Sequence, residues 1–130
     1  MVKEYNSQRN AAAVEALAPD LVGVIPPQAV ELEEAVLGAL MLEADKVTEV
    51  QEYLTEQSFY KEEHRLIYRA INALSAEQKP IDIYTVTSQL KSKRELTKVG
   101  GAAYLAQLTL RVGSAANIEI HSRIITQKHI

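Results

Sequence analysis

Apolar side chains recur every three or four residues along most of the chain after residue 26, which is the spacing of one face of an α-helix. Each such stripe predicts one helix, and the third indicates a helix over about residues 61–77. The stripes are Ala29, Leu32, Val36 and Leu40; Val47, Val50 and Leu54; His64, Ile67, Ile71 and Leu74; Ile83, Val86 and Leu90; Tyr104, Leu105 and Leu108; and Ile118, His121 and Ile125. We therefore expect an all-α fold, a compact multi-helix orthogonal bundle.

Residues with helix-capping chemistry separate these stripes. Asp82 stands three residues before Thr85, the spacing of an N-cap residue, and is expected to open a helix. In the same way Asp45 is expected to cap the short second helix, and Ser114 the last one. Residues 81–83 alternate as a strand would, but the run is too short to compete with the helix.

The first 25 residues differ from the rest of the chain. They are mostly polar, with a short alanine-rich patch that ends before Pro19, and they offer little apolar surface to offset the entropy of ordering. Pro26 and Pro27 then mark a boundary. We expect a mobile N-terminal arm over residues 1–25 and a helical globular domain over residues 26–112.

Composition narrows the class of protein further. The chain has 130 residues, of which 47% are apolar and 24% charged, as in an ordinary globular domain. Its net charge of −3 argues against a domain whose main task is to coat nucleic acid. The sequence has no cysteine, which excludes a disulfide framework, a thiolate zinc site and a cysteine nucleophile. The longest apolar run, residues 36–42, is too short to span a membrane, and we expect a cytoplasmic protein.

The sequence carries no recognisable catalytic motif. A phosphate-binding GxxxxGK[ST] loop, an HExxH pair and a GxSxG elbow are all missing, and no cofactor is expected for this chain. Adjacent acids such as Glu33 and Glu34, or Glu62 and Glu63, point about 100° apart on a helix. We interpret them as solvated faces rather than as an acid–base couple.

A histidine and a run of basic residues each allow a structural and a functional interpretation. His64 lies on the inward stripe of its helix, where a core histidine bonded to backbone is favoured over a switch or a ligand. The basic run Lys91, Lys93, Arg94 and Lys98 is interrupted among charged residues only by Glu95. We favour a solvated face over a phosphate contact, because cations suit a helix C-terminus and no aromatic residues interleave with them.

The final predicted helix has more apolar surface than a single groove needs. Ile118, His121 and Ile125 form one stripe, whereas Ile120 and Ile124 form a second, offset stripe. Such a helix either lies in a groove or is shared with another molecule, for example a second copy of the chain. The chain stops at Ile130 without a capping residue, and we expect it to be a fragment.

Several short phrases of the sequence have a familiar order and spacing over residues 26–130. They are Pro26-Pro27-Gln28-Ala29-Val30-Glu31, Glu33-Glu34-Ala35-Val36-Leu37-Gly38, Phe59-Tyr60 with His64, Pro80-Ile81-Asp82, Val99-Gly100-Gly101 with Tyr104-Leu105, and Ser114-Ala115-Ala116-Asn117-Ile118. Together they resemble the N-terminal domain of the bacterial replicative DNA helicase, the DnaB family. Many members have a glycine near Arg94, so that turn differs here.

The resemblance implies a collar domain of a hexameric ring, which assembles from dimers and docks the primase and possibly a helicase loader. Residues 113–130 would then be the truncated start of a helical hairpin. ATP and Mg²⁺ would belong to a motor domain absent from this chain, and single-stranded DNA would pass through the parent ring. The alternatives are a free-standing helical DNA-binding domain and, least supported, a small enzyme.

The resemblance also points to candidate contact residues. Glu31 follows the Pro-Pro phrase and is the candidate for contacting a primase; otherwise it only favours the helix dipole. Tyr104 is a second candidate, although its stripe with Leu108 favours a place in the core. Self-association into a weak dimer is expected through four isoleucines, which are Ile118, Ile120, Ile124 and Ile125.

Overall fold

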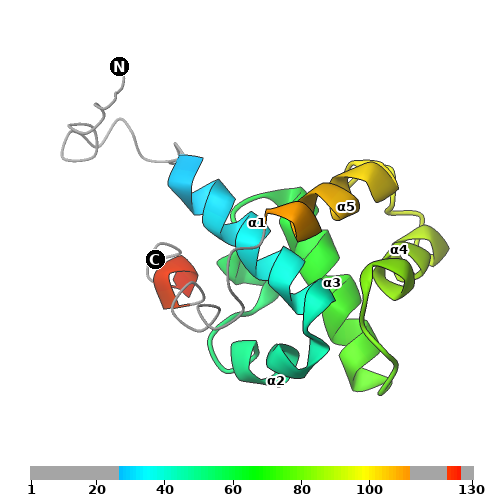
Figure 1. Cartoon of the computed structure of the whole chain (residues 1–130), viewed down its shortest axis with the longest axis horizontal. Helices are drawn as coiled ribbons and strands as arrows, with labels where there is room; N and C mark the ends of the chain where they lie inside the picture. The colour runs from blue at the N-terminus through cyan, green and yellow to red at the C-terminus, as the bar shows by residue number, and fades with distance from the viewer. Residues whose placement is uncertain (1–26, 112–122, 127–130) are drawn as a thin grey trace.

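The computed structural model describes residues 27–111 and 123–126, and that part of the chain is built from helices without a strand (Figure 1). In chain order the elements are α1 (Pro27–Leu42), the 3₁₀ turn η2 (Ala44–Lys46), α2 (Val47–Val50), the 3₁₀ turn η3 (Glu56–Ser58), α3 (Glu62–Ala76), α4 (Ile83–Ser92) and α5 (Gly101–Leu110). The predicted all-α class is confirmed. Among the described residues, no helix combines the length and apolar character that crossing a bilayer requires.

Helix α3 forms the centre of the body, since α1 packs against one part of it and α4 against another, while α5 packs across α1 (Figure 1). Its predicted bounds of 61–77 agree with the observed ones to one residue at each end. The side chains that α3 buries are His64, Leu66, Ile67, Tyr68, Ala70, Ile71 and Leu74. The stripe predicted for this helix is therefore confirmed.

Of the three predicted helix caps, one is confirmed, one is wrong and one lies outside the described residues. Asp82 is the N-cap of α4, and its carboxylate accepts hydrogen bonds from the backbone N–H groups of Tyr84 and Thr85 at 2.8 and 2.9 Å. The prediction for Asp45 is wrong, because this residue lies inside η2 and Lys46 precedes α2 without a side-chain cap. A 3₁₀ turn that leads straight into α2 leaves no cap position for Asp45. The proposed cap Ser114 lies outside the described residues.

The start of α1 corrects the dipole argument made for its acidic residues. The helix begins at Pro27, so its first turn contains no acid, and Glu31 lies beyond it. Proline suits this first position because its missing N–H would have no partner in the helix. The helix dipole therefore does not account for the carboxylates of α1.

Residues 123–126 form a helical turn that packs on the body. The Ile125 side chain is buried in the core, and the Thr126 hydroxyl donates a hydrogen bond to the Tyr53 carbonyl at 2.8 Å. The Arg123 guanidinium lies over the Tyr53 ring, 5.2 Å from its centroid. This contact joins two parts of the chain that are 70 residues apart.

Helix α4 ends in a turn whose backbone favours glycine but carries Arg94. The residue has φ +61°, and the next N–H, that of Glu95, donates to the Leu90 carbonyl at 2.8 Å. The Arg94 N–H donates to the Lys91 carbonyl at 3.0 Å, which completes a Schellman motif. Arg94 thus has a left-handed backbone in the turn where many sequences of the resembled family have a glycine.

Replacing Arg94 with glycine is expected to stabilise the protein by about 0.5–1 kcal/mol. The left-handed conformation costs an ordinary residue about 1–2 kcal/mol, and the greater freedom of unfolded glycine cancels only part of that gain. Lys93 has φ −93° and is the matched control, since Lys93→Gly removes the same charge without relieving strain. Urea denaturation should show Arg94→Gly above, and Lys93→Gly at or below, the unchanged chain; the reverse order would contradict the argument.

Candidate functional site

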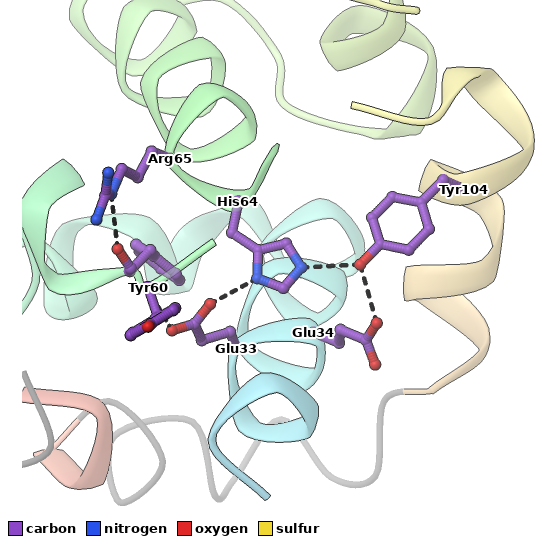
Figure 2. A network of polar contacts seen from close by, with 7 residues as sticks. Glu33, Glu34, Tyr60, His64, Arg65 and Tyr104 are labelled. Carbon is purple, nitrogen blue, oxygen red and sulfur yellow. Dashed lines mark hydrogen bonds and ion pairs between the residues drawn. The ribbon is translucent and has the colours of Figure 1, made fainter. Parts of the chain in front are cut away.

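A chain of polar side chains crosses the core and joins α1, α3 and α5 (Figure 2). Glu33 Oε1 lies 2.6 Å from His64 Nδ1, and His64 Nε2 lies 2.8 Å from the Tyr104 hydroxyl. That hydroxyl donates to Glu34 Oε2 at 2.9 Å. The imidazole is thus held at both nitrogens by side chains from two other helices.

Both glutamates of this network are buried, which overturns their interpretation as a solvated face. Glu33 is 2% and Glu34 8% exposed. The reason is that α1 is enclosed by α3 and α5, and every residue from 36 to 41 is buried as well. A helix enclosed on most sides hides neighbouring positions that point about 100° apart.

His64 is a core residue as expected, but its partners differ from the prediction. Its side chain is fully buried, and both ring nitrogens contact side chains rather than backbone. The Tyr104 ring is parallel to the imidazole, with an interplanar angle of 6° and ring centroids 6.1 Å apart, and Phe59 meets the imidazole edge-on at 6.5 Å. The neighbouring rings fix the plane in which the imidazole makes its two hydrogen bonds.

The three hydrogen bonds of the network require three protons. Since the Tyr104 hydroxyl gives its proton to Glu34, His64 Nε2 must carry the proton that is donated to Tyr104. The third proton then lies between His64 Nδ1 and Glu33.

Two further contacts satisfy the remaining carboxylate oxygens. Glu33 Oε2 accepts a hydrogen bond from the Tyr60 N–H at 2.7 Å (Figure 2). Glu34 Oε1 lies 3.3 Å from Arg111 Nε at the more exposed end of the network. Each buried acid is thus paired with a base and a hydrogen-bond donor, as burial of a charge demands.

The turn before α5 positions Tyr104. Gly100 has φ +107°, and a Cβ atom at this position would lie 2.8 Å from the Cβ of Tyr104. Only glycine combines that backbone conformation with so close an approach. Burial, with the hydrogen bond to Glu34 and its negative charge, raises the pKa of Tyr104 above its ordinary value. The hydroxyl therefore stays protonated and donates its hydrogen bond to Glu34.

Within residues 27–111 and 123–126, no cluster of acids and histidines could hold a metal ion. The polar network holds three helices together. Its effect is to set the rotation of α1 against α3 and α5. With Glu33 and Glu34 turned inward, the Glu31 side chain is exposed on the outer face of α1.

The other predicted site residues fall in different places. Tyr104 packs against the core, as its stripe favoured, and its possible contact with a partner stays a prediction. Ile124 is half-buried and Ile125 is buried within the chain's own core, so Ile125 offers no surface in this arrangement. Ile118 and Ile120 lie outside the described residues. Self-association through this segment stays a prediction.

The all-helical body, tied through its core by a carboxylate–histidine–tyrosine network, defines a helical domain in its described part. The family model described as the DnaB-like helicase N-terminal domain matches residues 25–127. The chain belongs to this family of helicase N-terminal domains. The resemblance inferred from the ordered sequence phrases is confirmed.

Individual relatives agree with this assignment. The chain is 45% identical over 126 residues to the replicative DNA helicase DnaB of Rhodothermus marinus, covering 97% of this chain and 13% of that protein. It is 41% identical over 106 residues to the replicative DNA helicase DnaC of Bacillus subtilis, covering 82% and 23%. The crystal structure of the N-terminal domain of DnaB helicase from Mycobacterium tuberculosis is similar, with a TM-score of 0.75 and 34% identity over 77% of this chain and 72% of that one.

Proposed function

We propose that this chain serves as the N-terminal collar domain of a replicative DNA helicase, where it supports ring assembly and docks the primase or a loader. The observation that carries the proposal is the family match over residues 25–127. The chain spans only 13% of the Rhodothermus marinus relative and 23% of the Bacillus subtilis relative. A role as one part of a larger machine accounts for both facts.

The division of labour follows from this role. ATP hydrolysis, with its Mg²⁺ ion, and the grip on single-stranded DNA during unwinding belong to a separate motor domain. The collar contributes rigid surfaces, and the network around His64 supports them because it locks α1, α3 and α5 together. A cytoplasmic location, where bacterial DNA is copied, is part of the same proposal.

Copies of the chain are expected to associate as pairs, from which a hexameric ring is built in the parent protein. A two-fold pair uses the same patch on both molecules and is the commonest way for identical chains to associate. Of the isoleucines expected in that patch, Ile124 keeps part of its side chain exposed. It is the described residue through which we expect the pair to form.

Glu31→Lys is expected to weaken primase binding at least about fivefold. The side chain is exposed on α1, so reversing its charge alters the surface without disturbing the core. A lost surface contact to a charged partner typically shows as a change of this size or more. Pull-down and calorimetric titration with the primase of the same organism would measure the change.

Glu52→Lys is the matched control, because Glu52 is also exposed and the charge change is the same. Equal binding by the unchanged chain and Glu31→Lys would remove Glu31 from the interface. If the unchanged chain bound no primase at all, the docking role itself would be wrong.

A further inference from the structure

The end of α4 and the turn after it carry four exposed cations that have no acidic partner in the described part of the chain. Lys91, Lys93, Arg94 and Lys98 are all exposed. None of the ion pairs formed within residues 27–111 and 123–126 includes any of them. An unneutralised group of like charges on a chain of net charge −3 attracts an anionic partner to one place on the surface.

Capping of α4 does not require these side chains. The carbonyls at its end accept backbone hydrogen bonds, from the Lys93 N–H to Gln89 and from the Glu95 N–H to Leu90. The Lys91 carbonyl is likewise taken by the Arg94 N–H. The ammonium and guanidinium groups are therefore free to meet a ligand.

The only acid between residues 83 and 111 is held away from this group. Glu95 lies 3.6 Å from Arg69 Nη1, and only 18% of its side chain is exposed. Arg69 of α3, which also pairs with Glu56 at 3.1 Å, is thus the basic partner of the one carboxylate near the cations. At the end of α4 and in the following turn, four cations face this single acid.

An exposed aromatic ring lies on the same face of α4 as Lys91. Tyr84 is 80% exposed on α4, seven residues before Lys91. Seven residues of helix turn about 700°, so the two side chains share a face within about 20°, roughly 10 Å apart along the axis. Figure 1 shows α4 at the edge of the body opposite residues 123–126.

We propose that this surface, Tyr84 with Lys91, Lys93, Arg94 and Lys98, binds single-stranded DNA. The cations contact phosphates and the tyrosine ring stacks on a base, which is the combination that single strands require. An acidic protein segment would use the same cations but gains little from an exposed ring, so the ring favours the nucleic acid. The proposal rests on α4 and its turn, and it does not depend on primase docking.

Fluorescence anisotropy with a labelled 15-nucleotide oligo-dT and the purified 130-residue chain tests the proposal. Up to four phosphate contacts predict a plot of log affinity against log salt with a slope no steeper than about −3. Lys91→Gln with Lys93→Gln should lower affinity at least tenfold at 50 mM NaCl and reduce the slope to about −1.5. Tyr84→Ser should lower affinity about fivefold or more and leave the slope unchanged.

Two matched controls separate this surface from general charge and general exposure. Lys46→Gln with Lys79→Gln removes the same charge elsewhere, and Leu110→Ser removes an apolar side chain that is 84% exposed. Both should bind like the unchanged chain. The proposal is overturned if the chain does not bind at 20 mM NaCl, or if the control double variant loses as much affinity as the α4 variant. It is equally overturned if Tyr84→Ser binds normally while a poly-aspartate peptide competes as well as the oligonucleotide.

Discussion

Replacing His64 with leucine is expected to lower the free energy of unfolding by about 3–5 kcal/mol at pH 7. The imidazole bonds to Glu33 on one side and Tyr104 on the other, and all three lie within the core or packed against it. Leucine would fill much of the space but leave Glu33 as a buried charge without its base. Removing one partner of a buried pair typically costs this much. Urea denaturation followed by circular dichroism measures the loss.

A double-mutant cycle distinguishes loss of the pair from loss of packing. The double variant Glu33→Leu with His64→Leu should lose less stability than the sum of the two single losses, by at least about 1 kcal/mol. Each single variant leaves one buried polar group without its partner, whereas the double variant leaves none. Glu31→Gln, an exposed change on the same helix, should stay within about 0.5 kcal/mol. A loss below 1 kcal/mol for His64→Leu would show that the network does not stabilise the fold.

The elements of the fold were predictable because their signals are local. The spacing of three and four residues between apolar positions predicted the bounds of α3 to within one residue at each end. The capping side chain of Asp82 predicted the start of α4. Each of these features depends on neighbours a few residues away. The failed cap at Asp45 is also local, since a 3₁₀ turn and a cap use the same residue types.

The polar network was not predictable from local signals. Glu33 and Glu34 are buried because α3, about 30 residues later, and α5, about 70 residues later, both pack against α1. A usable signal was nevertheless present: the residues after Glu34 are apolar all round the helix, which indicates a helix enclosed on most sides. A histidine on the inward stripe of α3 then offered such acids a partner.

Raising the pH from 10 to 12 is expected to remove about 2 kcal/mol of stability through Tyr68 alone. Burial raises the pKa of Tyr68 to about 12, against a lowering effect of Asn72, and its hydroxyl donates to the Leu54 carbonyl at 3.0 Å. The unfolded phenol ionises near pH 10, so the folded state binds more protons between these values. This stability is fully present below pH 10 and is lost as the pH rises through the folded pKa.

Tyr68→Phe isolates this effect, because phenylalanine has no proton to lose. The variant should be about 1 kcal/mol less stable at pH 8, where it lacks only the hydrogen bond to Leu54, and more stable than the unchanged chain above about pH 11. Tyr84→Phe is the control for loss of an exposed phenol: the site is 80% exposed, so the change should alter stability by no more than about 0.5 kcal/mol at pH 8. Urea denaturation at pH 8, 10 and 11.5 measures both differences. A Tyr68→Phe difference that stayed constant over this range would mean that the buried phenol does not hold its proton more tightly in the folded state.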